Sequence, residues 1–153
     1  MTGDHVASPR GLKAMNKLVM VLLRLGIPIS RREEPVVLTV RGRRSGKPRS
    51  TPITPMTVDG VRYVVNGYPG ADWVANVRAA AGDATLTKGR RREQVRMVEL
   101  GADEARPVLR EFRTQVAVGV DLMKRAGILQ TGSAEELEGM AGRLPVFRIE
   151  PVT

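Results

Sequence analysis

A strand, a basic turn and a second strand follow one another between Leu38 and Ile53. Val36, Leu38 and Val40 alternate with other residues, which is the period of a β-strand with one buried face. The turn contains glycines, which reach backbone angles that a Cβ atom disfavours. Pro52 in the second strand cannot donate a ladder hydrogen bond. The sequence therefore predicts an antiparallel hairpin whose second strand lies at an open edge of a sheet.

Strand and helix signals alternate along the rest of the chain. Asp59-Gly60 and Gly89 each join two short strands as hairpin turns. Residues 144–149 form the last predicted strand, in which Pro145 indicates either an edge strand or the start of a strand. About six mainly antiparallel strands with helices between them favour an α+β fold that forms a small barrel.

Several helix starts carry capping signals. A short helix is predicted to begin at Trp73 with Asp72 as its N-cap, and Asp103 is expected to cap a longer helix. Ser133 and Glu136 have the spacing of a capping box that opens one more helix. On spacing alone, the helix at Trp73 is an amphipathic helix with one buried indole.

The length of 153 residues fits a single domain that covers residues 1–153 and has its own core. Residues 1–9 are predicted to form a flexible tail, and residues 10–25 an N-terminal amphipathic helix. That helix packs on the domain in one interpretation and touches an anionic membrane surface in the other. Since no secretory signal or spanning stretch is recognised, a cytoplasmic protein is expected, with or without membrane association.

The composition excludes several chemistries and indicates a charged partner. Cysteine is absent and His5 is the one histidine, so thiolate sites, metal sites and histidine-based catalysis are not expected. The net charge of +9 indicates nucleic acid, a membrane surface or a polyanionic ligand as partner. Aromatic residues make up only 3% of the chain, which disfavours base stacking. Nucleic acid therefore ranks last, and none is expected to bind.

Five cations surround the first turn. A P-loop is excluded because Gly42 and Gly46 are too close together and Pro48 stands where a hydroxyl residue should begin a helix. Successive N–H groups in a glycine bend can nevertheless bind an anion, and arginines pair with phosphate or carboxylate. A solvated hairpin tip without a ligand is the alternative. The five cations are Arg41, Arg43, Arg44, Lys47 and Arg49.

A second basic cluster contains Lys88 and residues 90–92 at another predicted hairpin tip. A solvated turn is the favoured interpretation of this cluster, and nucleic-acid contact is the second. The chain shows no carboxylate pair placed for acid–base hydrolysis and no serine in a nucleophile elbow. Chemistry carried by a cofactor therefore suits this sequence better than side-chain catalysis.

Three stretches together resemble the deazaflavin-dependent nitroreductase family. They are the basic hairpin Leu38–Ile53, the helical segment Asp72–Ala80 and the last strand region Leu144–Pro151. The resemblance implies a split β-barrel related to FMN-binding reductases. It also implies the deazaflavin coenzyme F-420, whose phosphodiester and oligoglutamate tail is a polyanion, with flavin mononucleotide (FMN) the less favoured cofactor.

The resemblance further implies which residues bind the coenzyme. The turn would hold the phosphate and glutamates, and the second strand would line the deazaflavin ring. A loop near residue 67 would close over the phosphate or ring, supported by a tryptophan–asparagine helix. In this order the residues are Arg43, Arg44, Ser45, Gly46, Lys47 and Arg49; Thr51, Pro52 and Ile53; Gly67 and Tyr68; and Trp73 and Asn76.

The reaction implied by the resemblance is hydride transfer from the reduced coenzyme to a small acceptor, such as a quinone, an activated alkene or a nitro compound. No catalytic side chain, covalent side-chain intermediate or metal is required. Some branches of the family are thought to bind fatty acids at membranes, so a non-enzymatic, membrane-associated binder of the same fold is the alternative. Either a monomer or a homodimer is expected.

Overall fold

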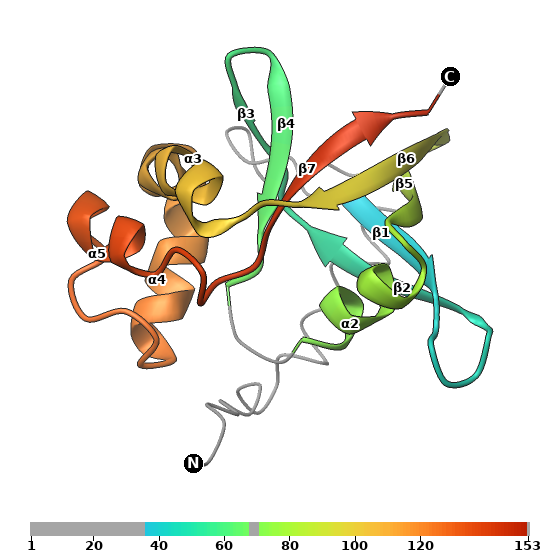
Figure 1. Ribbon diagram of the computed structural model, residues 1–153, viewed down its shortest axis with the longest axis horizontal. Helices are drawn as coiled ribbons and strands as arrows, with labels where there is room; N and C mark the ends of the chain where they lie inside the picture. Colours follow the sequence, from blue (N-terminus) through green and yellow to red (C-terminus); the bar gives the residue numbers. More distant parts are fainter. Residues whose placement is uncertain (1–35, 68–70, 153) are drawn as a thin grey trace.

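A computed structural model describes residues 36–67 and 71–152 of the chain. The strands form one curled antiparallel half-barrel in the order β2-β1-β5-β6-β7-β4-β3 (Figure 1). The predicted α+β fold with an antiparallel, barrel-like sheet is confirmed. The strands are β1 (Val36–Arg41), β2 (Pro48–Ile53), β3 (Met56–Val58), β4 (Val61–Val65), β5 (Asp83–Lys88), β6 (Arg91–Glu99) and β7 (Val146–Pro151).

The sheet in the described residues has seven strands, one more than the predicted count of about six. β7 is the last strand in the chain but lies between β6 and β4. Of the two expectations for Pro145, the edge strand is therefore wrong and the strand start is correct. Pro145 precedes β7, so its missing N–H removes no ladder bond, and its carbonyl accepts from the Asn66 N–H at 2.9 Å.

Two hydrophobic cores lie on opposite faces of the sheet, because neighbouring residues of a strand point to opposite sides. Phe147 packs in the first core with Trp73 and Leu38, against α2 (Asp72–Ala79). Its neighbour Val146 packs in the second core, which is covered by three helices. Figure 1 shows these helices gathered on the side away from α2. They are α3 (Ala102–Gln115), α4 (Ala117–Arg125) and α5 (Ala134–Gly139).

Two of the predicted helix caps are wrong. The N-cap residue is Ala71 in α2 and Gly101 in α3, and neither of them makes a side-chain capping hydrogen bond. Asp72 and Asp103 instead lie in the first turns, where a carboxylate also favours the helix dipole, and each pairs with an arginine. The capping signal at Ser133 is confirmed, since its Oγ accepts from the Glu136 N–H at 3.1 Å.

The two edge strands of the sheet, β3 and β2, differ in the hydrogen bonding of their outer backbone groups. At β3, the side-chain amide of Gln115 donates to the Thr57 carbonyl at 2.6 Å and accepts from the Thr57 N–H at 2.9 Å. Gln115 thus satisfies the backbone groups that an edge strand would leave open. β2 has no such cover from the described residues, as predicted for the proline-containing strand.

Several predictions concern residues outside the described part. They are the tail at residues 1–9, the helix at residues 10–25 and the position of Tyr68. The membrane contact predicted through residues 10–25 therefore stays a prediction. Within residues 36–67 and 71–152, none of the helices is both long enough and apolar enough to cross a membrane.

Candidate functional site

The turn between β1 and β2 is closed by its own backbone. The Gly42 N–H donates to the Lys47 carbonyl at 2.8 Å, and the Gly46 N–H donates to the Gly42 carbonyl at 2.9 Å. Gly46 has a φ of 71°, the left-handed conformation that glycine adopts most readily in a bulged hairpin. Ser45 Oγ accepts from the Lys47 N–H at 3.2 Å. The turn therefore has a defined shape before any ligand binds.

Arg43 fastens this turn to α2. Its backbone N–H and its Nη1 both donate to Asn76 Oδ1, at 3.1 and 2.8 Å. Its Nη2 lies 3.2 Å from Asp72 Oδ1, and Nη1 also reaches the Asp72 carbonyl at 3.4 Å. Asn76 is only 5% exposed, so α2 presents a buried acceptor to a residue 33 positions earlier.

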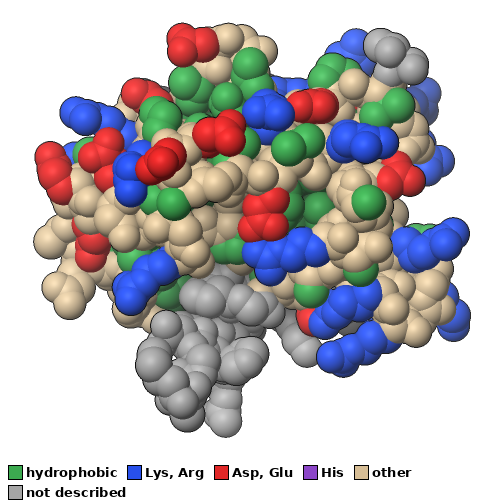
Figure 2. All heavy atoms as spheres, viewed as in Figure 1, with side chains coloured by type: hydrophobic (Ala, Val, Ile, Leu, Met, Phe, Trp, Pro, Cys, Tyr) green, Lys and Arg blue, Asp and Glu red, His purple; other side chains and the backbone are tan. Residues whose placement is uncertain are grey.

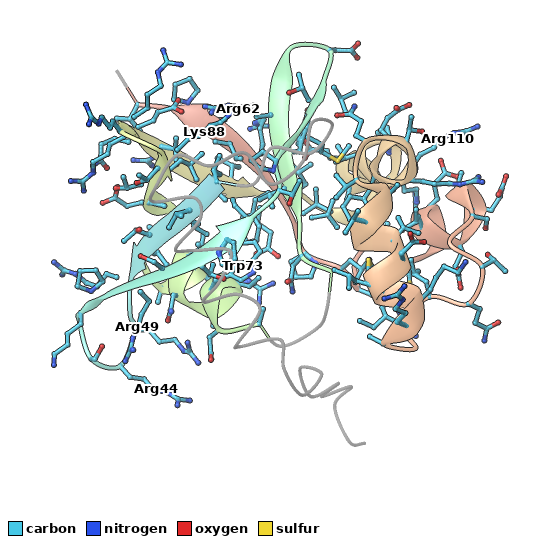
Figure 3. The ribbon with its side chains drawn as sticks, turned by 180° about the vertical axis from the view of Figure 1, so that it is seen from behind. Arg44, Arg49, Arg62, Trp73, Lys88 and Arg110 are labelled. Atoms are coloured by element: carbon cyan, nitrogen blue, oxygen red, sulfur yellow. The ribbon has the colours of Figure 1, made fainter. Side chains whose placement is uncertain are left out.

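The other cations of the turn are exposed and form no ion pair within the part of the chain that the structure describes. They are Arg41, Arg44, Lys47 and Arg49. Figure 3 shows Arg44 and Arg49 at this end of the molecule, and Figure 2 shows basic side chains gathered over β1, β2, β5 and β6. Because these four charges are not neutralised by described neighbours, they raise the positive potential at the turn.

Only part of the predicted N–H cradle is available. Gly42, Gly46 and Lys47 donate within the turn, and Arg43 donates to Asn76. The N–H groups of Arg44 and Ser45 have no partner among the described residues. Two free N–H groups beside four exposed cations form a donor set that fits phosphate and carboxylate groups.

The backbone of β2 pairs with β1 on one side and has no strand partner among residues 36–67 and 71–152 on the other, which is called the open side below. The Gly42–Lys47 bond and the register Val40↔Arg49 and Leu38↔Thr51 turn the N–H and carbonyl groups of Arg49 and Thr51 toward β1. Pro48, Ser50 and Pro52 therefore direct their backbone groups to the open side. Since proline lacks an N–H, this side presents three carbonyls and only the Ser50 N–H. Ile53 is buried in the first core and Thr51 is half-buried, so the predicted ring-binding segment offers mainly acceptors at its edge.

The remaining predicted residues lie around α2 and β4. Trp73 is 8% exposed and packs in the first core, where its ring centroid lies 5.5 Å from that of Phe147. Gly67 follows β4 beside α4, where a Cβ would contact the Met123 side chain at 3.4 Å. The described structure thus brings together Arg43 and Asn76, holds Trp73 in the interior, and places Gly67 next to α4.

One residue of the site, Asp72, was missed. The sequence predicts Asp72 as an N-cap, whereas its carboxylate contacts Arg43 in the structure. Asp72 and Asn76 are four positions apart and therefore share one helix face, which is a signal for a common partner. Because that partner lies 29 residues away, no local pattern identifies it.

The second basic turn, at residues 88–92, has a different environment. β5 runs antiparallel to β1, so Thr87 lies beside Val37 at the start of β1, far from the first turn. Glu93 next to it forms a bidentate pair with Arg62 of β4, at 2.8 and 2.6 Å. This hydrogen bonding lowers the pKa of Glu93 and raises the pKa of Arg62.

Among similar solved structures, one with a TM-score above 0.5 supports the fold. One similar structure, described as a domain-swapped dimer, shares 20% identity and a TM-score of 0.54, covering 88% of this chain and 95% of that chain. An F420-H2 dependent reductase, FDR-A, shares 22% identity with a TM-score of 0.42, covering 80% and 97%. Campylobacter jejuni ChuZ shares 10% identity with a TM-score of 0.46, covering 96% of this chain and 56% of that one.

A comparison with curated proteins returns no match. Residues 19–127, more than half of the chain, match the family described as F420-H2-dependent quinone reductase, where F420-H2 is the reduced form of coenzyme F-420. This match agrees with the resemblance inferred from the basic hairpin and the tryptophan–asparagine helix. The chain therefore belongs to the F420-H2-dependent quinone reductase family.

Proposed function

We propose that the protein transfers a hydride from F420-H2 to a quinone, and that the β1–β2 turn holds the anionic tail of the coenzyme. Membership of the family supplies the reductase activity and the coenzyme. The observation that supports the binding site is the set of exposed cations on a turn whose shape is set by its own hydrogen bonds.

Arg44, Lys47 and Arg49 are proposed to pair with the phosphate and glutamates, together with the free N–H groups of Arg44 and Ser45. Gly46 contributes the left-handed backbone that exposes these groups. Arg43 contributes mainly through position, because its guanidinium is already bonded to α2. Trp73 and Asn76 are proposed to support the site from α2 rather than to contact the coenzyme.

Thr51, Pro52 and Ile53 are proposed to lie along the deazaflavin ring. The open side of β2 offers carbonyls and the Ser50 N–H, which can orient a ring that carries both donors and acceptors. When bound, the reduced deazaflavin supplies the hydride, so the protein needs only to bind, orient and exclude water. Gly67 and Tyr68 are proposed to close the site.

The proposal extends to the hydride acceptor, the domain boundaries and the oligomeric state of the protein. A quinone-type acceptor follows the family description, while alkenes and nitro compounds remain the other acceptors to be compared. We propose that residues 1–153 form one coenzyme-binding domain. A homodimer is supported by one similar structure that is a domain-swapped dimer, and light scattering would distinguish it from a monomer.

Fluorescence titration of the purified protein with oxidised coenzyme F-420 tests binding, and oxidation of F420-H2 with a water-soluble quinone tests turnover. Saturable binding at micromolar protein and quinone-dependent oxidation are expected. Absence of binding would overturn the proposed site. Binding without any quinone-dependent turnover would keep the site but reject the quinone as acceptor.

A further inference from the structure

The Asp72 carboxylate is the one acidic group that the described structure places on a cation of the basic turn. Its Oδ1 lies 3.2 Å from Arg43 Nη2, and its side chain is 86% exposed. We infer that Asp72 is an internal competitor for the anionic tail, occupying one edge of Arg43 until a phosphate or carboxylate of the coenzyme replaces it. This inference rests on the proposed tail-binding role of the turn.

Two side chains of α2, Asn76 and Asp72, accept hydrogen bonds from Arg43, and they hold it to different extents. Asn76 Oδ1 accepts both the backbone N–H and Nη1 of Arg43 from a buried position. Asp72 Oδ1 accepts only from Nη2, at the longer distance of 3.2 Å. If the Asp72 contact were lost, Asn76 and the closed turn would still hold Arg43 in place. Asp72 is therefore not needed to position the turn.

The charge of Asp72 acts against a polyanionic ligand. It removes one unit of positive charge from a turn whose other cations are exposed and not paired with described residues. An exposed ion pair contributes little stability, so an incoming anion can displace this carboxylate at small cost. While Nη1 stays on Asn76, Nη2 becomes available to the ligand. The arrangement lowers the affinity for the tail and speeds its release.

The test compares coenzyme binding by the wild type and by Asp72→Asn, which removes the charge but keeps an oxygen acceptor of the same shape. At low ionic strength we expect the variant to bind coenzyme F-420 about 1.4- to 5-fold more tightly, the range of one exposed ion pair. The gain should appear as slower dissociation in stopped-flow fluorescence, and it should shrink at high salt.

Three controls isolate the effect. Asp72→Glu keeps the charge and should bind like the wild type. Asp103→Asn removes an equal charge from a similar exposed pair with Arg106 on α3, where the carboxylate is 92% exposed, and should leave binding unchanged. The deazaflavin chromophore without its phosphate and glutamates should bind the wild type and Asp72→Asn equally.

The outcomes separate this inference from the function on which it rests. If the wild type does not bind coenzyme F-420, the proposed site is overturned and the inference falls with it. If the wild type binds but Asp72→Asn binds equally or more weakly, only the inference is overturned. Weaker binding would make Asp72 a positioning residue, and equal binding would give it no role in binding. A gain that is equal for the tail-less chromophore also overturns it, because the effect would not act on the tail.

Discussion

Two basic hairpin turns look alike in the sequence and differ in the structure. The first, at residues 42–47, lies at the edge of the sheet and is fastened to α2 by Arg43. The second, at residues 88–92, joins β5 and β6 inside the sheet order, and the Arg62–Glu93 pair lies at its base. Figure 3 shows Arg44 of the first turn at the lower left and Lys88 of the second turn at the upper left, both on the side of the molecule away from Arg110.

The difference shows that positive charge alone does not define a binding site. Both turns carry exposed arginines, but among the described residues only the first lies beside an unpaired strand edge and a buried acceptor on a neighbouring helix. A turn held in one shape loses less conformational entropy when it binds a ligand. The first turn is therefore the better candidate for a specific anion site.

The largest expected effect comes from removing the acceptor that fastens the first turn. Asn76→Ala leaves the Arg43 N–H without its partner and leaves Nη1 only the longer bond to the Asp72 carbonyl, so the free energy of unfolding should fall by about 1–3 kcal/mol. Coenzyme affinity should fall as well, because the turn is no longer positioned. Chemical denaturation and fluorescence titration measure the two effects.

Gln115→Ala is the matched control for that variant, because it also removes two hydrogen bonds of one side chain, here both to the Thr57 backbone at the opposite edge of the sheet. It should lower stability without changing coenzyme affinity. An Asn76→Ala protein that is destabilised but binds the coenzyme normally would contradict the importance of the fastening.

A smaller effect is expected from removing equal charge at each turn. Arg44→Ala with Lys47→Ala should weaken coenzyme binding about 2- to 30-fold, the range for two exposed ion pairs, and less at high salt. Arg90→Ala with Arg91→Ala should change it by less than about 2-fold, since only long-range potential is lost. If the two double variants lost the same affinity, at both low and moderate salt, the protein would be using its net charge rather than a defined site.

The smallest effect concerns the base of the second turn. The Arg62 hydrogen bond lowers the pKa of Glu93 below its ordinary value of 4.5. The pair therefore stabilises the fold above about pH 4.5 and loses this contribution as pH falls through the lowered pKa. Both side chains are a third or more exposed, so we expect only about 0.2–1 kcal/mol.

Urea denaturation of the wild type and Glu93→Gln between pH 6 and pH 3 measures this contribution, and the variant should show a shallower loss in acid. Glu136 has its own acid-sensitive contribution, because backbone N–H groups of residues 130 and 132 lower its pKa to about 2. Glu136→Gln and the double variant separate the two. A change in coenzyme affinity in Glu93→Gln would mean that the second turn contributes to the site.

Local patterns predicted the elements well. The alternation at Leu38 and Val40 marks two buried residues of β1. The Asp59-Gly60 turn has positive φ at both residues, 51° and 78°, as a two-residue hairpin turn requires. Ser133 caps α5 as predicted. These features depend on interactions between residues close in sequence, so they can be recognised without the fold.

Other features could not be recognised locally. Asp72 and Asp103 carry the residue type of an N-cap, but the extended cap residues are Ala71 and Gly101, and each carboxylate pairs with an arginine instead. The place of β7 between β6 and β4 depends on pairing between strands far apart in the chain. The prolines of β2 indicate an edge strand. The side of β2 to which their carbonyl groups point, however, depends on the register with β1.

The sequence by itself determined the fold class, the family and the basic hairpin, because strand period, turn residues and charge are properties of short segments. Only the tertiary structure decided which cations of that hairpin are available. Arg43 is held by Asn76 and Asp72 across about 30 positions of sequence, while Arg44, Lys47 and Arg49 remain exposed. The physical reason is that a charge acts through its neighbours in space, and those neighbours are set by the packing of α2 against β1 and β2.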